Sequence, residues 1–253
     1  MRDGSLIPRF GRARRDPDLA VLEGFHAVKH ALRFGARIEL LVTPDRSALL
    51  ALAEQLAPDL PPRLQDEARE VDAELFAQLV PLPPKTGVVA IARRPPVEVD
   101  ALLAGPAGPL VLLEDPRDLG NMGACVRVAA AADAGAVLTT GSHDPWHADA
   151  LRGAAGLHFA LPVARLDDLH ALAGSDRPVV GLDPDGEELD LATLDERAIL
   201  AFGTERDGLS PELVARADAL LRIPMREGVS SLNLATAVAA VLFARRLTAA
   251  GRG

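Results

Sequence analysis

Three glycine-containing segments in the second half of the sequence carry polar side chains where an α/β protein would bind a ligand. They are Asp118-Leu-Gly-Asn-Met-Gly123, Gly203-Thr-Glu-Arg-Asp-Gly208 and Arg226-Glu-Gly-Val-Ser-Ser-Leu-Asn233. Each follows an apolar run typical of a buried strand, and α/β sheets bind ligands beyond the carboxyl ends of their strands. The first segment lacks the GxGxxG spacing of a dinucleotide loop, and no P-loop lysine follows any of the three. An ordinary nicotinamide or nucleoside triphosphate site is therefore not indicated.

Five polar residues in or beside these segments are candidates for the chemistry: Asn121, Arg127, Glu205, Ser231 and Asn233. The asparagine amides and the serine hydroxyl can both donate and accept hydrogen bonds, and the glutamate can hold an arginine through a bidentate pair. We expect these side chains to converge on one pocket. Taken singly, Arg127 could be a surface helix arginine, Ser231 a helix N-cap and Glu205 a solvated loop acid.

The elements around these segments alternate between strand and helix. Continuous apolar runs predict five buried strands, at Leu110–Leu113, Ala136–Thr139, Val179–Leu182, Ile199–Phe202 and Leu220–Ile223. Helices are predicted at about 122–134, at Pro211–Ala217 with Ser210 as N-cap, and at about 231–247. The last helix is apolar on most faces, which favours burial, and a subunit interface is one way to bury it.

The first half predicts a smaller α/β unit. An apolar stripe over residues 19–34 predicts a helix ended by Gly35, followed by a strand at 38–42, helices at 47–56 and 67–79, and a strand at 88–92. Prolines and glycines between residues 93 and 109 indicate a linker. The predicted organisation is a flexible basic arm at 1–17, a substrate-binding domain at 18–94, a linker at 95–109 and a larger domain at 110–253.

The composition excludes several classes of protein. The 253 residues are 49% hydrophobic and 25% charged, which is ordinary for a globular protein and excludes disorder or a collagen-like chain. The single cysteine, Cys125, cannot form an internal disulfide, and we find neither an apolar leader nor a membrane-spanning run. A cytoplasmic protein is therefore predicted. The net charge of −9 argues against a surface that is basic throughout, but 25 arginines against two lysines permit local basic patches.

In order and spacing, three runs resemble the motifs of the SpoU/TrmH branch of the SPOUT RNA methyltransferases. These runs are 121–127, 203–210 and 223–233. Upstream, Gly24-Phe-His-Ala-Val and Gly87-Val-Val-Ala resemble the small L30e-like substrate-binding domain that many members carry. One departure concerns the first motif, which usually reads Asp-Pro-x-Asn, whereas four residues separate Asp115-Pro116 from Asn121 here. Either this loop is longer here or Asp118 takes the acidic position.

The resemblance implies transfer of a methyl group from S-adenosyl-L-methionine to a ribose 2′-OH of RNA. The implied fold is a parallel sheet with a C-terminal trefoil knot, a rare exception to un-knotted chains, in a homodimer with sites at the subunit interface. By position, Gly203, Ile223 and Leu232, with their neighbours Thr204 and Met225, match the cofactor loops. Arg127 matches the motif 1 arginine, and because a guanidinium is normally a fixed cation, we expect it to orient the 2′-OH and a phosphate.

Other interpretations lead to different substrates or functions. Ribosomal RNA is favoured over transfer RNA because the extra N-terminal domain resembles that of the ribosomal enzymes. The alternatives are a tRNA 2′-O-methyltransferase, a non-catalytic RNA-binding protein that keeps the fold, and an unrelated α/β enzyme that binds NAD or ATP. Neither DNA nor a membrane is an expected partner. No metal is expected, because the pairs His26/His30 and His143/His147 lack a third ligand. We expect Cys125 to be a buried apolar residue and Trp146 to pack rather than stack on a base.

Overall fold

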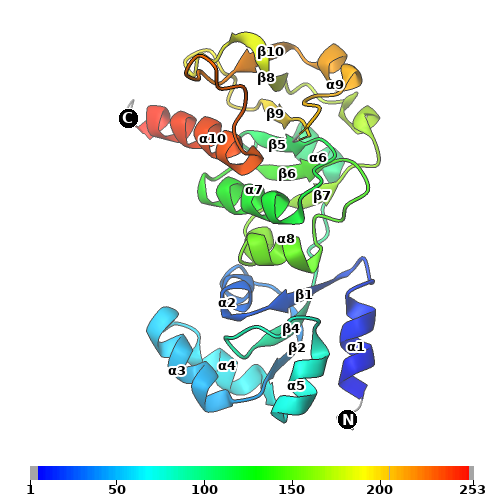
Figure 1. Cartoon of the computed structure of the whole chain (residues 1–253), viewed down its shortest axis with the longest axis vertical. Helices are drawn as coiled ribbons and strands as arrows, with labels where there is room; N and C mark the ends of the chain where they lie inside the picture. Colours follow the sequence, from blue (N-terminus) through cyan, green and yellow to red (C-terminus); the bar gives the residue numbers. More distant parts are fainter. Residues whose placement is uncertain (1–4, 205, 251–253) are drawn as a thin grey trace. The chain divides into compact units, whose positions relative to one another are not determined.

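The computed structural model describes residues 5–204 and 206–250 and divides the chain into two compact units (Figure 1). Unit 1 contains Met1–Pro96 and Trp146–Ala160, and unit 2 contains Val97–Pro145 and Leu161–Gly253. The chain therefore passes between the units three times. The first passage falls inside the predicted linker. By contrast, Trp146–Ala160, which the sequence assigns to the C-terminal domain, belongs to unit 1.

Unit 1 is built on a four-stranded sheet in the order β1-β4-β2-β3, in which only the β2/β3 pair is parallel. Its elements in chain order are α1 (Leu6–Ala13), β1 (Leu19–Glu23), α2 (Phe25–Arg33), β2 (Ile38–Thr43), α3 (Arg46–Leu56), α4 (Pro61–Glu67), β3 (Ala68–Glu70), α5 (Ala73–Leu79), β4 (Val89–Arg93), α8 (Ala148–Gly153) and the 3-10 helix η2 (Leu157–Phe159). The small α/β unit predicted from the sequence is confirmed.

Two predictions about the start of the chain differ from the structure. Within the predicted flexible arm, Leu6–Ala13 form helix α1, and its apolar side chains Leu6 and Phe10 are buried in a core that includes Phe76 of α5. The arm is ordered there because burial of these side chains offsets the entropy of fixing the backbone. The predicted helix over residues 19–34 begins only at Phe25.

The error over residues 19–23 has a physical reason. The run Leu19–Glu23 suits either the apolar stripe of a helix or a strand, and pairing with β4, 66 or more residues away, selects the strand. Similarly, the predicted helix at 67–79 is interrupted by β3, because Ala68–Glu70 pair with the edge of β2. Local periodicity cannot report such long-range pairing.

The segment 146–160 is attached to unit 1 through a buried carboxylate. Glu23, at the end of β1, forms ion pairs with Arg14 and with Arg152 of α8, the latter at 2.5 Å. Close packing adds to this attachment, because a side chain at Gly156 would overlap with the main chain of Ala27. Helix α8 is therefore part of the unit 1 fold.

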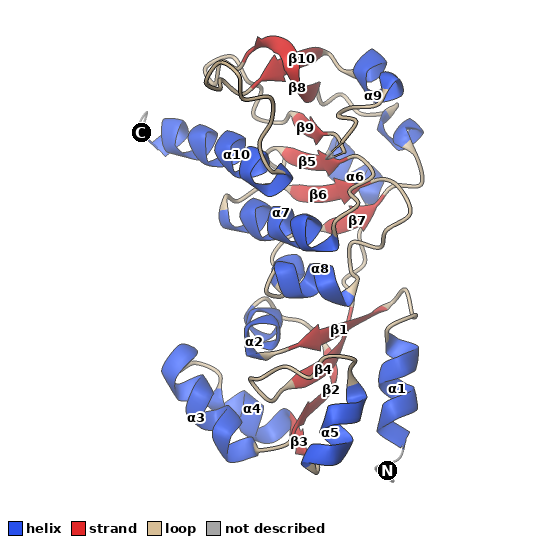
Figure 2. Cartoon of the chain, in the orientation of Figure 1, coloured by secondary structure: helices blue, strands red, loops and turns tan. Residues whose placement is uncertain are grey.

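Unit 2 is built on a six-stranded sheet in the order β10-β8-β9-β5-β6-β7, and every pair of neighbours is parallel (Figure 2). Its elements are α6 (Val99–Ala104), β5 (Leu110–Leu113), α7 (Leu119–Ala131), β6 (Ala136–Thr139), β7 (Val163–Arg165), the 3-10 helix η3 (Leu169–Leu172), β8 (Val179–Glu188), β9 (Ile199–Phe202), α9 (Pro211–Arg216), β10 (Ala219–Arg222) and α10 (Leu234–Ala250). The predicted parallel sheet is confirmed. The short β7, and α6 inside the predicted linker, were not predicted.

Helices cover both faces of this sheet. On one face, Leu112 and Ile199 belong to a buried cluster that includes Leu103 of α6 and Leu213 of α9. Helices α7 and α10 lie side by side on the other (Figure 1). In the described part of the chain, no helix is both long and apolar enough to cross a membrane.

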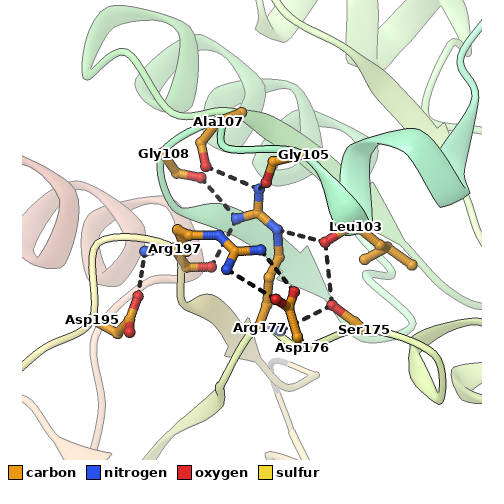
Figure 3. A network of polar contacts seen from close by, with 9 residues as sticks. All are labelled: Leu103, Gly105, Ala107, Gly108, Ser175, Asp176, Arg177, Asp195 and Arg197. Atoms are coloured by element: carbon orange, nitrogen blue, oxygen red, sulfur yellow. Dashed lines mark hydrogen bonds and ion pairs between the residues drawn. The ribbon is translucent and has the colours of Figure 1, made fainter.

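One arginine fixes the end of the predicted linker to unit 2. Arg177 is 3% exposed, and its five N–H groups donate to the main-chain carbonyls of Leu103, Gly105, Ala107, Gly108 and Arg197, at 2.7–3.2 Å (Figure 3). Burial lowers its pKa from the ordinary arginine value. Beside it, Arg197 pairs with Asp176 in a more exposed position. All donors of a buried cation are thus satisfied without a carboxylate.

Candidate active site

A cavity of about 680 Å³ opens in unit 2 where the sheet strands end. Its wall is formed by residues of β8, the end of β9, the loop that follows it and the segment after β10. All five predicted cofactor positions belong to this wall: Gly203, Thr204, Ile223, Met225 and Leu232. Ser231 and Asn233 line it as well. The volume lies within the range of about 300 to 1,000 Å³ usual for small-molecule sites.

The loop between β9 and α9, described for residues 203–204 and 206–210, forms one side of the cavity. Thr204 and Gly208 exchange two main-chain hydrogen bonds, at 2.9 and 3.2 Å, which close the loop into a tight turn. A side chain at Gly203 would overlap with the main chain of Gly208. Glycine is therefore required at position 203 by close approach of the backbone. We call this segment the β9–α9 loop.

A second side of the site is the start of α7. The Asp118 side chain caps this helix by accepting a hydrogen bond from the main-chain N–H of Asn121 at 2.7 Å. Asp115 instead lies four residues before the helix, with φ of +39°, and pairs with the exposed Arg117. Of the two interpretations of the first motif, the geometry favours Asp118 in the acidic position, because its carboxylate binds the main-chain N–H of Asn121.

Two of the predicted polar residues meet directly. The Asn233 side chain donates from Nδ2 to Oδ1 of Asn121 at 2.9 Å. Its Oδ1 accepts from the amides of Ala235 and Thr236 in the first turn of α10. Asn233 therefore joins the starts of α7 and α10. It also takes the capping place considered for Ser231, because α10 begins at Leu234.

Two of the predicted polar residues, Arg127 and Glu205, are not placed at the cavity by the structure. Arg127 lies on α7, is exposed, and forms no hydrogen bond or ion pair with any residue that the structure describes. It does not line the cavity of its own chain. Glu205 lies outside the described residues. Of the predicted polar residues, Ser231 and Asn233 line the cavity and Asn121 contacts Asn233 without lining the cavity, whereas Arg127 does not line it within one chain.

A smaller hollow of about 290 Å³ adjoins the cavity. It is lined by Arg117, Asp118, Asn121, Thr204, Arg206 and Asp207, and the last two also line the larger cavity, as does Thr204. Sequence reasoning did not select Arg206, nor the β8 residues Asp183 and Asp185 in the cavity wall. The signal for Asp183 was present, since it directly follows an apolar strand run in a parallel sheet.

The remaining candidates are structural. Cys125 is buried, as expected. Trp146 is buried against Phe159 and His158, and Arg94 lies over its ring, so the expected packing role is confirmed. His30 binds the carbonyl of Ala155 at 2.8 Å, and burial lowers its pKa. Among the described residues, no three His, Cys, Asp or Glu side chains gather as metal ligands would.

Comparisons with known proteins agree with this geometry. The model of the SpoU rRNA Methylase family matches residues 108–243. A 23S rRNA (adenosine(1067)-2′-O)-methyltransferase of Streptomyces laurentii is 34% identical over 187 residues, which cover 70% of this chain and 68% of the relative. An uncharacterized tRNA/rRNA methyltransferase of Mycobacterium bovis is 33% identical over 183 residues. That match covers 68% of this chain and 64% of the relative, slightly under two thirds of its length.

A solved structure extends the likeness over nearly the whole chain. The AdoMet-bound rRNA methyltransferase from Sinorhizobium meliloti superposes with a TM-score of 0.76 at 28% identity, covering 97% of this chain and 94% of that one. The SPOUT fold class predicted from the sequence is thereby confirmed.

Proposed function

Since the chain belongs to the SpoU rRNA methylase family, we propose that it transfers a methyl group from S-adenosylmethionine to a ribose 2′-OH of ribosomal RNA. The observation that carries this proposal is the cavity whose wall contains all five residues expected to hold the cofactor. The Streptomyces and Sinorhizobium relatives, which are named as rRNA methyltransferases, support ribosomal RNA as the substrate.

The donors in the cavity wall fit the adenosyl part of the cofactor. The main-chain N–H groups of Ile223, Met225 and Leu232 donate to no residue that the structure describes. Such groups need a partner from water or from a ligand. An adenine ring and a ribose present acceptors to main-chain donors, so these three residues would hold the cofactor. Thr204 and Gly203 would shape the opposite wall.

The polar residues would prepare the acceptor oxygen. Bound S-adenosylmethionine supplies an electrophilic methyl group carried by a sulfonium sulfur. When the methyl group is transferred, the rest of the cofactor leaves as a neutral thioether. Asn121, fixed by the Asp118 cap and by Asn233, presents an amide beside the cavity. Arg127 would hold a phosphate and the 2′-OH as a fixed cation, leaving the final proton acceptor to another group.

We propose that the protein works as a homodimer. The exposed position of Arg127 outside its own cavity is explained if each protomer's Arg127 acts at the cavity of the other. On α10, Leu247 is 71% exposed and Phe243 is also exposed, which provides apolar surface for a second copy. Analytical ultracentrifugation should show a dimer, and Leu247→Glu should shift it toward monomer.

We propose that unit 1 binds the RNA and that the protein acts in the cytoplasm. Arg12 and Arg15 are exposed at the end of α1 and form no ion pair with a described residue. Cations placed in this way can contact RNA phosphates. The contribution of such contacts to the affinity for RNA falls steeply as the salt concentration rises.

The first test is calorimetric titration with S-adenosylmethionine and S-adenosylhomocysteine, with NAD and ATP as controls, followed by tritium transfer to ribosomal and transfer RNA. Saturable binding of the first two and labelling of ribosomal RNA are expected. Binding of S-adenosylmethionine without transfer to any RNA would favour a non-catalytic RNA binder. Tighter binding of NAD or ATP would contradict the proposal.

Two replacements of Asn233 distinguish its contact with Asn121 from its capping of α10. Asn233→Ala should lower the transfer rate by about tenfold through loss of the Asn121 contact, and should cost about 1 kcal/mol of stability through loss of the α10 cap. Asn233→Asp keeps an acceptor for the cap, so its melting temperature should stay near that of the wild type, while Asn121 can bind the new carboxylate only by turning its own amide, so the rate should still fall. Equal rates in all three proteins would show that the Asn121 contact does not matter for transfer.

A further inference from the structure

Glu114 is a buried acidic residue directly after β5, and it lies outside the three motif runs 121–127, 203–210 and 223–233. It is 7% exposed, and both carboxylate oxygens bind one residue, Ser210, which stands 96 positions later. Oε2 accepts from the Ser210 amide at 2.8 Å, and Oε1 accepts from the Ser210 hydroxyl at 2.5 Å. A carboxylate that is almost fully buried is thus satisfied by two donors of a single residue.

Ser210 marks the point where the β9–α9 loop becomes helix α9. Its Oγ, besides donating to Glu114, accepts from the Leu213 amide at 3.2 Å and caps the helix. The position of Glu114 therefore determines where the loop ends.

Glu114 also determines where the same loop begins. Its amide donates to the carbonyl of Phe202, the last residue of β9, at 2.9 Å. One residue directly after β5 thus binds the chain immediately before and immediately after the loop. Between these two points, Gly203, Thr204 and Gly208 line the cavity, together with Arg206 and Asp207.

We infer that Glu114 is a positioning residue, which holds the β9–α9 loop in the shape that binds S-adenosylmethionine. This inference rests on the proposed function. A carboxylate suits the arrangement, because Ser210 presents two donors and each needs an acceptor. A glutamine has one acceptor oxygen, and its NH₂ group could bind the Ser210 oxygen only if the hydroxyl hydrogen turned away to another acceptor, so one charge-assisted hydrogen bond would be lost.

The test compares Glu114→Gln and Ser210→Ala with a matched control, Ser175→Ala. Ser175 also holds a turn, since its Oγ accepts from the Arg177 amide at 3.2 Å and donates to the Leu103 carbonyl at 3.4 Å, but it lies outside the cavity wall. Two measurements are made on the full chain. One is amide hydrogen exchange without ligand, and the other is the KM for S-adenosylmethionine together with kcat for ribosomal RNA.

Both Glu114→Gln and Ser210→Ala should speed exchange by about tenfold at Asp207 and Gly208, whose amides both donate to Thr204, as expected for loss of a hydrogen bond to a charged group. They should raise the KM for S-adenosylmethionine by about the same factor while kcat stays within about twofold. The double variant should resemble Ser210→Ala alone, because the two residues act through one contact. The Ser175→Ala control should match the wild type in loop exchange and in KM.

The outcomes separate this inference from the proposed function. Unchanged exchange of the loop in Glu114→Gln overturns the inference whether or not a ligand binds. A lower kcat with unchanged KM also overturns it, because this is the result of a smaller folded fraction rather than of a displaced loop. A wild-type protein that does not bind S-adenosylmethionine refutes the proposed function, and loop exchange still decides whether Glu114 holds the loop.

Discussion

Replacing Arg127 by alanine is expected to reduce methyl transfer to ribosomal RNA by about 10² to 10³-fold, the usual cost of removing a donor aimed at developing charge. The affinity for S-adenosylmethionine should not change, since Arg127 does not line the cavity of its own chain and is proposed to hold RNA rather than the cofactor at the other. The fold should also be kept, because the side chain is exposed and binds no described residue. Arg127→Lys should recover only part of the rate, since an ammonium cannot form the planar two-point contact of a guanidinium. Tritium transfer at saturating cofactor measures the rate, and calorimetry measures the affinity.

Mixed dimers show which cavity Arg127 serves. Leu232→Trp should block the cavity without disturbing the core, because Leu232 is exposed in the cavity wall. If Arg127 acts across the interface, an inactive Arg127→Ala protein mixed with an inactive Leu232→Trp protein should regain activity, because one intact cavity then faces one intact arginine. If Arg127 acts within its own chain, the mixture stays inactive. Wild-type rates in Arg127→Ala itself would exclude any role for this residue in transfer.

The second large effect concerns stability. Arg177→Met keeps an apolar stem of similar length but removes five hydrogen bonds to main-chain carbonyls, of which the Leu103 carbonyl keeps the Ser175 hydroxyl as a donor, and should lower the free energy of unfolding by about 3 to 5 kcal/mol. The free energy of unfolding of Arg177→Lys should lie between those of the wild type and of Arg177→Met, because an ammonium offers three donors in place of five. Urea denaturation followed by circular dichroism measures the change.

Arg197→Met is the matched control for this prediction. Arg197 lies beside Arg177 and pairs with the exposed Asp176, and such surface pairs contribute little. Its main-chain carbonyl, which accepts from Arg177, is unaffected by the substitution. Equal destabilisation by Arg197→Met and Arg177→Met would mean that the buried carbonyl contacts are not the source of the effect.

The sequence predicted the sheet of unit 2 well, because its signals there are local. The runs Leu110–Leu113, Ala136–Thr139 and Ile199–Phe202 have the same bounds in the sequence prediction and in the structure. Each is a continuous apolar run with no competing helical stripe. The five residues proposed to hold the cofactor were selected from the motif runs, and all five line the cavity.

The missed features depend on contacts far apart in the chain. Helix α6 lies inside a run of prolines and glycines, and the carbonyls at and beyond its end are bound by Arg177, about 70 positions later. Glu114 appears in the sequence as one more acidic residue, because its partner, Ser210, stands 96 positions later at the end of the second motif run. Arg127 was correctly placed on a helix, but its exposure outside the cavity depends on how the chain folds around α7.

The attachment of α8 to unit 1 also affects how proteins of this architecture can exchange parts during evolution. A recombination point in the linker would transfer Glu23 without Arg152, because the two lie on opposite sides of that point in the sequence. The recipient would have to supply an α8 segment that pairs with the incoming carboxylate and leaves room where Gly156 meets Ala27. Successful chimeras should therefore inherit the amino-terminal half and residues 146–160 from the same parent.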